Sequence, residues 1–215
     1  MGSKCTFFSR CHIKILKFVS PPNLTPGHNP ITWLSCMLAA SVMITCASIL
    51  PYASTATSSP LVVGALPSTI VLDGPSGANV NGTAWTSDSI AKTGKVISLF
   101  YVDPEERKLN EDVELAYDNM HFSKEEHGSV AVINMAAAWY PNNLINRELT
   151  VKQAKFPRTT YVKDLKKSLV KEWDLQDDSV NIVVFGKDGK IIFIKKGPIS
   201  PSEIPKLMAL ISANL

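Results

Sequence analysis

The stretch Lys95-Val-Ile-Ser-Leu-Phe-Tyr-Val102, followed by Asp103-Pro-Glu-Glu106, decides the fold predicted for this chain. Its first part is a short apolar run with β-branched and aromatic residues, which is typical of a buried strand. Its second part is typical of a helix start, because Asp can cap free N–H groups, Pro fits the first helical position and Glu suits the positive end of the dipole. Beyond it the apolar residues fall on one face of a helix predicted to reach Met120: Leu109, Val113, Ala116, Tyr117 and Met120.

Charge is distributed unevenly along the 215 residues, whose net charge is +3. The only charged residues before Asp73 are basic: Lys4, Arg10, Lys14 and Lys17. Of the 22 basic and 19 acidic side chains, 18 basic and all 19 acidic ones remain in the rest, which gives it a net charge of −1. The folded part therefore offers no case for nucleic-acid binding.

All cysteines lie in the first 46 residues: Cys5, Cys11, Cys36 and Cys46. The sequence after them can form no disulfide, no thiolate metal site and no cysteine nucleophile.

The first sixty residues have the features of an export segment. We divide the chain into a basic extension (1–30), a hydrophobic segment (31–50), a linker (51–60) and a folded domain (61–215). Ile31 to Leu50 is an uncharged run that spans about 30 Å as a helix, enough to cross a bilayer core. The basic residues before it would stay in the cytoplasm and send the later chain outward. Ser54-Thr-Ala56 resembles a signal-peptidase site, so two interpretations stay open: a cleaved signal sequence, or an uncleaved anchor in the inner membrane.

From Leu61 onward strand and helix signals alternate, which predicts an α/β layered domain. The end of the chain is the clearest part. Asn181 to Phe185 and Ile191 to Ile194 flank the turn signal Asp188-Gly189, which predicts a buried hairpin. Ser200-Pro-Ser-Glu203 is typical of a capping box before a final helix.

The order of these elements resembles the thioredoxin fold, and more narrowly the YtfJ-like family of periplasmic thioredoxin-fold proteins. The residues that carry the resemblance are Gly64-Ala-Leu-Pro67, Gly94-Lys95, Trp173-Asp-Leu175, Val183-Val-Phe-Gly-Lys-Asp-Gly189, Lys196-Gly197 and Ser200-Pro-Ser-Glu203. The resemblance implies a three-layer sandwich, with a central mixed sheet and helices on both faces, preceded here by one hydrophobic N-terminal helix. It implies an exported domain without an established reaction.

Both halves of a thioredoxin redox site are missing under this resemblance. The position of the Cys-x-x-Cys motif falls near Glu106 to Leu109, where no cysteine stands. The position of the cis-proline falls on Val180, and we expect a trans bond there because a cis bond before a non-proline residue costs about 2.5–4 kcal/mol.

Three groups of residues are candidate sites, each with a plainer alternative. Asp103, Glu105 and Glu106 could form an acidic binding edge or supply a general base, or be a capped helix start with solvated acids. Trp139 and Tyr140 follow a predicted strand and could be a partner surface or a satellite core. The third group is a pair of histidines with nearby acids, which could bind a metal or lie in a solvated turn: His121, His127, Glu125 and Glu126. We expect no cofactor and no bound metal.

Three functions remain open. The first is a non-catalytic module in the periplasm that binds a protein or peptide through the loops around Asp103 and Trp139, with Val180 in the same docking edge. The second is an enzyme that borrows a thiol from a partner or from a ligand such as glutathione. The third is a structural protein tethered to the inner membrane by Ile31 to Leu50.

Overall fold

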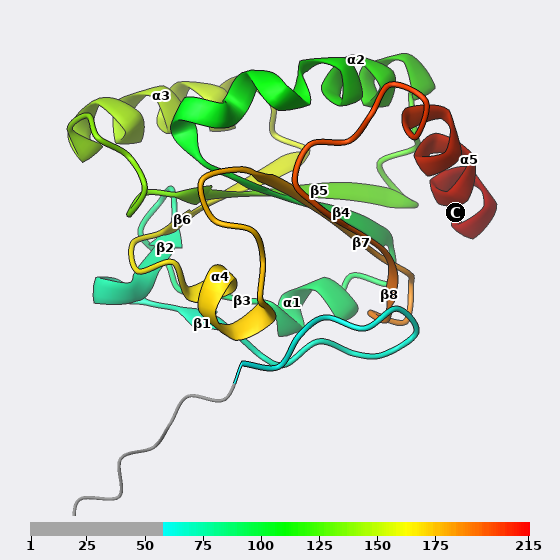
Figure 1. Ribbon diagram of the computed structural model, residues 1–215, viewed down its shortest axis with the longest axis horizontal. Coiled ribbons are helices and arrows are strands. Elements are labelled where there is room, and N and C mark those ends of the chain that lie inside the picture. The colour runs from blue at the N-terminus through cyan, green and yellow to red at the C-terminus, as the bar shows by residue number, and fades with distance from the viewer. Residues whose placement is uncertain (1–57) are drawn as a thin grey trace, which may run out of the picture. The chain divides into compact units, whose positions relative to one another are not determined.

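A computed structural model describes residues 58–215 (Figure 1). The predicted basic extension, the hydrophobic segment and most of the linker lie outside the described residues. Within residues 58–215 no helix has both the length and the apolar character needed to span a bilayer.

The centre of the domain is a six-stranded mixed sheet with the order β2-β6-β5-β4-β7-β8. β4 pairs in parallel with β5, and β5 in parallel with β6, whereas β2, β7 and β8 join antiparallel. The strands are β2 (Gly77–Asn79), β4 (Val96–Val102), β5 (His127–Asn134), β6 (Thr159–Asp164), β7 (Val180–Phe185) and β8 (Ile191–Lys196). A separate two-stranded sheet contains β1 (Val71–Leu72) and β3 (Trp85–Thr86). The predicted strand around 96–102 and the terminal hairpin are confirmed.

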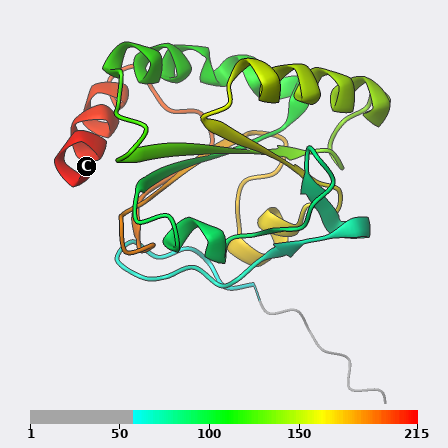
Figure 2. The same cartoon turned by 180° about the vertical axis from the view of Figure 1, so that it is seen from behind.

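Helices cover both faces of the sheet, as Figures 1 and 2 show, so the predicted thioredoxin-like three-layer sandwich is confirmed. One face carries the 3₁₀ helix η2 (Pro104–Asn110) with α2 (Glu111–Met120), α3 (Asn142–Lys155) and α5 (Ile204–Asn214). The other carries α1 (Asp88–Ala91) and α4 (Ser168–Trp173) with β1, β3 and the 3₁₀ turn η1 (Gly74–Ser76). We call the layer of η2, α2 and α3 the helical face.

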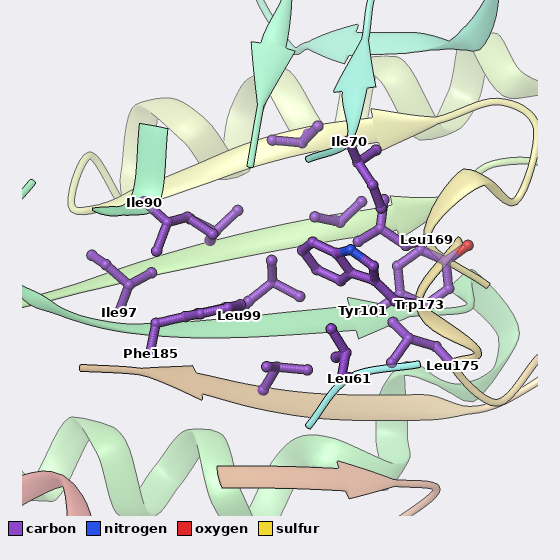
Figure 3. Close-up of a cluster of buried hydrophobic side chains, with 14 of the residues drawn as sticks. Leu61, Ile70, Ile90, Ile97, Leu99, Tyr101, Leu169, Trp173, Leu175 and Phe185 are labelled. Atoms are coloured by element: carbon purple, nitrogen blue, oxygen red, sulfur yellow. The ribbon is translucent and has the colours of Figure 1, made fainter. Parts of the chain in front are cut away.

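The alternating side chains of β4 connect the layers. Leu99 and Tyr101 join the core under α1 and α4, whereas Val96 joins the core under α2 and α5. Figure 3 shows Trp173 of α4 among the side chains of the first core. Its indole Nε1–H donates to the Ser68 carbonyl at 2.9 Å, so the largest buried side chain is also hydrogen-bonded. Burying each large apolar side chain stabilises the fold by about 1.5–3 kcal/mol.

The predicted helix from Pro104 to Met120 is wrong in its first half. The chain forms a 3₁₀ helix up to Asn110, and only then an α-helix. A 3₁₀ helix has three residues per turn, so the 3.6-residue spacing fails there and Leu109 is 43% exposed, while Val113 is fully buried. Met120, predicted on the buried face, is also exposed; it is the last residue of α2, before the left-handed His121.

Candidate functional site

Polar side chains gather where β4 and β5 end. Asp103 directly follows β4, and Asn134 is the last residue of β5. The two strands run in parallel, so their carboxyl ends lie at the same edge of the sheet. The antiparallel partner β7 begins at this edge, since Val102 pairs with Val180, and it brings Ser179 next to Asp103. We call this group the edge cluster; it consists of Asp103, Asn134, Asp177, Asp178 and Ser179.

Asp103 is the buried member of the edge cluster, with only 2% of its surface exposed. Its Oδ2 accepts the backbone N–H of Ser179 at 2.9 Å, and its own N–H donates to the Ser179 carbonyl at 3.1 Å. Its Oδ1 is buried and has no hydrogen-bond partner. Burial raises the pKa of Asp103 to about 6, although the nearby Asn134 side chain and the Ser179 N–H favour the charged form. The interpretation of Asp103 as a solvated helix cap is therefore wrong, because it makes no side-chain cap bond and holds the loop before β7 instead.

Asp177 and Asp178 complete the cluster from that loop. Asn134 Nδ2 donates to Asp177 Oδ1 at 3.2 Å, and Lys167 Nζ donates to Asp177 Oδ2 at 2.6 Å. This hydrogen bond raises the pKa of Lys167. One carboxylate oxygen from each of Asp103, Asp177 and Asp178 lies within 4.8 Å of the others. Asn134 is fully buried, and its Oδ1 has no partner.

Buried polar contacts fix the two loops that border the cluster. Asp164 Oδ2 accepts the Tyr101 hydroxyl at 3.3 Å and the backbone N–H of Leu169 at 3.0 Å, which ties the start of α4 to β4. Asn181 is bonded in both directions to the backbone of Gln176, at 2.9 Å each way. The carboxylates of the loop are thus presented from a supported backbone.

Trp139 is the most exposed of the large apolar side chains in residues 58–215, at 84%. Its backbone N–H donates to Glu105 Oε1 at 3.1 Å, so the structure brings together two residues that lie 34 positions apart. The Tyr140 ring meets the Trp139 ring edge to face, with centroids 5.7 Å apart. Tyr140 itself is partly buried against the small core under α3. Trp139 is thus exposed and Tyr140 belongs partly to a small core, while Glu106 is half-buried in the η2 turn.

Val180 does not offer a binding surface. Its side chain has no exposed area, and it pairs with Val102 inside the sheet. No peptide bond among residues 58–215 is cis, so the expected trans bond before Val180 is confirmed. A hydrophobic residue here belongs to the core, because β7 is buried along its whole length.

A cavity of about 230 Å³ lies in the helical face, between η2 and α2 on one side and α3 on the other. Its apolar lining includes Phe100, Ile133 and Tyr140. Charged side chains of both signs also line it: Arg107, Glu114, Asp118, Glu148 and Lys152. Burial raises the pKa of Glu114.

A second cavity of about 320 Å³ adjoins the first and contains both predicted histidines. Tyr117 donates its hydroxyl to Ser98 Oγ at 2.8 Å, and Ser98 Oγ lies 3.0 Å from His127 Nε2. Burial, assisted by the nearby charge of Arg158, lowers the pKa of His127 to about 4, so the ring is neutral at pH 7. Ser98 is fully buried and is no candidate nucleophile. The proposed histidine metal site gains no support, since the one candidate metal-ligating group in the described part is Asp103, Asp177 and Asp178.

Comparison with known proteins identifies the family of this chain. The family described as "Bacterial protein of unknown function (YtfJ_HI0045)" matches residues 69–214. The chain belongs to the YtfJ family. The resemblance drawn from the sequence is therefore confirmed, and no curated protein matches the sequence.

Solved structures similar to this YtfJ-family chain are thioredoxin-fold proteins. A Chlorobium tepidum chain classed as the thiol:disulfide interchange protein DsbE is 16% identical, with a TM-score of 0.49, and the match covers 72% of this chain and 98% of that one. StoA from Bacillus subtilis is 17% identical, with a TM-score of 0.45 and coverage of 68% and 98%. The thioredoxin domain of a Bacteroides vulgatus thiol-disulfide oxidoreductase is 12% identical, with a TM-score of 0.49 and coverage of 69% and 96%. These likenesses concern the fold alone.

The sequence did not single out four members of the edge cluster in this YtfJ-family chain: Asn134, Asp177, Asp178 and Ser179. One signal was available, because Asp177-Asp178-Ser179 ends one residue before the predicted strand 181–185, and loops at strand ends often carry ligand-contacting residues. Nothing in the sequence indicates that Ser179 meets Asp103, which is 76 residues away.

Proposed function

We propose that this protein is an exported thioredoxin-fold module that binds a protein partner through the helical face and Trp139, and that it carries out no disulfide exchange of its own. The observation that carries the proposal is the 84% exposure of Trp139 beside Glu105. An indole left in water forgoes about 1.5–3 kcal/mol of burial, which a partner would recover.

The backbone at Trp139 is preorganised. Glu105 holds its N–H, and the Tyr140 ring packs edge-on against the indole. A side chain that is already oriented loses less conformational entropy on binding, and Trp and Tyr are enriched among the residues that dominate interface energies. Both features favour a role in recognition over a role in the domain's own core.

Further apolar side chains stand exposed on the same helical face: Leu109, Leu115, Met120, Leu144, Val151 and Phe156. They come from η2, α2, α3 and the residue after α3. The cavity of about 230 Å³ lies between these helices and is smaller than the roughly 300–1,000 Å³ of typical small-molecule sites. It suits one or two apolar side chains of a partner, and the charges of both signs in its lining suit a polar rim around them.

The absence of cysteine after Cys46 argues against disulfide chemistry in the domain. The helix start that would lower a thiol pKa in a redox-active relative carries Glu105 and Glu106, which cannot attack a disulfide. Export rests on the basic residues before the uncharged run 31–50 and on the small residues after it. The periplasm is the compartment that these features favour, with the segment either cleaved or retained as an anchor.

Site-specific photocrosslinking in living cells tests the proposal. The full chain carries a photoreactive phenylalanine analogue at position 139, and a matched variant carries it at Val62, which is 60% exposed. Val62 belongs to the segment before β1, drawn in cyan in Figure 1, which lies on the side of the sheet opposite the helical face. We expect a discrete adduct with another envelope protein from position 139 and none from position 62. Equal labelling from both positions, or no adduct from either, would refute a specific surface at Trp139.

An insulin-reduction assay with the purified protein tests the second half of the proposal. We expect a rate equal to that of the reductant alone. Turnover above that rate, with or without glutathione, would favour the enzyme that borrows a thiol.

A further inference from the structure

We propose that the edge cluster is a binding site for a hard divalent cation of the size of Ca²⁺, with Asp103, Asp177, Asp178 and the Asn134 carbonyl as its protein ligands. The inference goes beyond the proposed function, because it rests on the cluster and not on Trp139.

Two buried oxygen atoms in the cluster have no partner. Asp103 Oδ1 belongs to a carboxylate that is 2% exposed and whose other oxygen is already held by Ser179. Asn134 Oδ1 belongs to a fully buried carboxamide that reaches into the cluster, since its Nδ2 donates to Asp177. A buried polar atom without a partner costs about 1–3 kcal/mol. A half-turn of the Asn134 carboxamide would exchange its oxygen and nitrogen and point the oxygen into the cluster. A cation between the carboxylates would then satisfy both Asp103 Oδ1 and Asn134 Oδ1.

The spacing of the oxygens fits one ion. Two ligands of the same ion can lie no further apart than twice the metal–oxygen distance, which is about 4.6–5.2 Å for Ca²⁺ and about 4.0–4.2 Å for Mg²⁺. One carboxylate oxygen from each of Asp103, Asp177 and Asp178 lies within 4.8 Å of the other two, which is inside the limit for Ca²⁺. All four donors are oxygen atoms. Oxygen ligands suit hard cations such as Ca²⁺ better than Zn²⁺ or copper, which favour nitrogen and sulfur ligands.

The charge of the cluster also fits a divalent ion. Three carboxylates face one another, and Lys167 is the ammonium that bonds to one of them. With all three acids ionised the group carries a charge of −2, which one divalent cation neutralises. Lys167 occupies Asp177 Oδ2 at 2.6 Å, so the ion would use Asp177 Oδ1, from which the Asn134 amide N–H withdraws when the carboxamide turns.

Calorimetry and thermal unfolding of the full chain, stripped with EDTA, test the site. The probes are CaCl₂, MgCl₂, MnCl₂ and ZnCl₂, each titrated alone into a phosphate-free buffer. We expect one Ca²⁺ per chain and, at a hundred times the dissociation constant, a rise in Tm of about 5–10 °C. Asp178→Asn should abolish the binding and the rise in Tm, because it removes one of the charged ligands. The fold should be kept, because Asn tolerates the left-handed backbone of this exposed position. Asp103→Asn should act in the same way.

Asp174→Asn is the matched control. Asp174 is another exposed acid with a left-handed backbone, but its carboxylate pairs with Lys196 outside the cluster. This variant should bind Ca²⁺ like the wild type, whereas Lys167→Gln should bind it several-fold more tightly, since a competing positive charge is gone. The inference is overturned if none of the four ions binds saturably up to millimolar concentration, if Zn²⁺ binds more tightly than Ca²⁺, or if the Tm shift survives in Asp178→Asn. Crosslinking at position 139 is scored separately, so either proposal can fail alone.

Discussion

Acid should unfold this protein in part through His127, whose ring is buried between α2 and the sheet. Only 6% of the residue is exposed, and its Nε2 lies 3.0 Å from Ser98 Oγ. Burial lowers its pKa from the ordinary 6.5 to about 4. The unfolded chain therefore takes up a proton at this histidine well before the folded protein does as the pH falls. The stabilising contribution is intact above pH 6.5 and is lost as the pH falls towards 4.

The magnitude follows from the two pKa values. Proton linkage at 1.36 kcal/mol per unit gives a loss of about 2 kcal/mol between pH 7 and pH 4.5 from this residue alone. His127→Gln should remove that loss, because Gln keeps a polar group near Ser98 but does not titrate. Urea unfolding of wild type and variant at several pH values measures the difference between their free energies of unfolding. The contributions of all titrating groups that the two proteins share cancel in this difference.

His121→Gln is the control for this prediction, since His121 is exposed at the end of α2. The free energy of unfolding of this control variant should depend on pH in the same way as that of the wild type. If His127→Gln and the wild type lose the same free energy of unfolding between pH 7 and pH 4.5, the reasoning from burial is refuted.

Two further pairs of substitutions test the fold that positions the site. Gly77→Ala should cost more than about 3 kcal/mol or prevent folding, because its φ is +147° and a Cβ would stand 2.0 Å from a backbone carbonyl of β6. Gly82→Ala, with φ +86° and nothing within 4 Å of its Cβ, should cost only about 1 kcal/mol in the same denaturation assay. Trp173→Phe should cost about 2–3 kcal/mol, because it opens a cavity and breaks the bond to the Ser68 carbonyl. Trp139→Phe, at an 84% exposed position, should stay within about 0.5 kcal/mol of the wild type, and equal losses at the two tryptophans would contradict the assigned burial.

The parts of the fold that could be predicted from the sequence are those set by local patterns. β4 is a run of apolar residues with a turn after it, and the hairpin of β7 and β8 has Asp188-Gly189 between two such runs. The shift from a 3₁₀ to an α-helix at Asn110 follows no such pattern. Asn110 is fully buried there, and tertiary packing decided its position against the spacing of the neighbouring apolar residues.

The candidate site was predicted only in part, for the same reason. Glu105 and Trp139 were both singled out, but their hydrogen bond depends on how two strand ends meet. A helix-start pattern describes the residues on either side of Asp103 well. The pattern cannot show that the Asp103 carboxylate turns inward. Its partner, the backbone N–H of Ser179, lies in a loop 76 residues later and takes the place of the helix N–H groups that a cap would bind.

The edge cluster and Trp139 are both positioned by the ends of β4 and β5. Asp103 and Glu105 are two residues apart at the end of β4, and Asn134 ends the strand that leads to Trp139. One carboxylate turns into the protein and the other turns out to hold the Trp139 backbone. This edge of the sheet therefore presents one buried and two more accessible carboxylates, together with the exposed Trp139 side chain. A buried carboxylate needs a compensating charge and an exposed aromatic side chain gains from burial, which is why the proposed cation site and the proposed partner surface both fall at this edge.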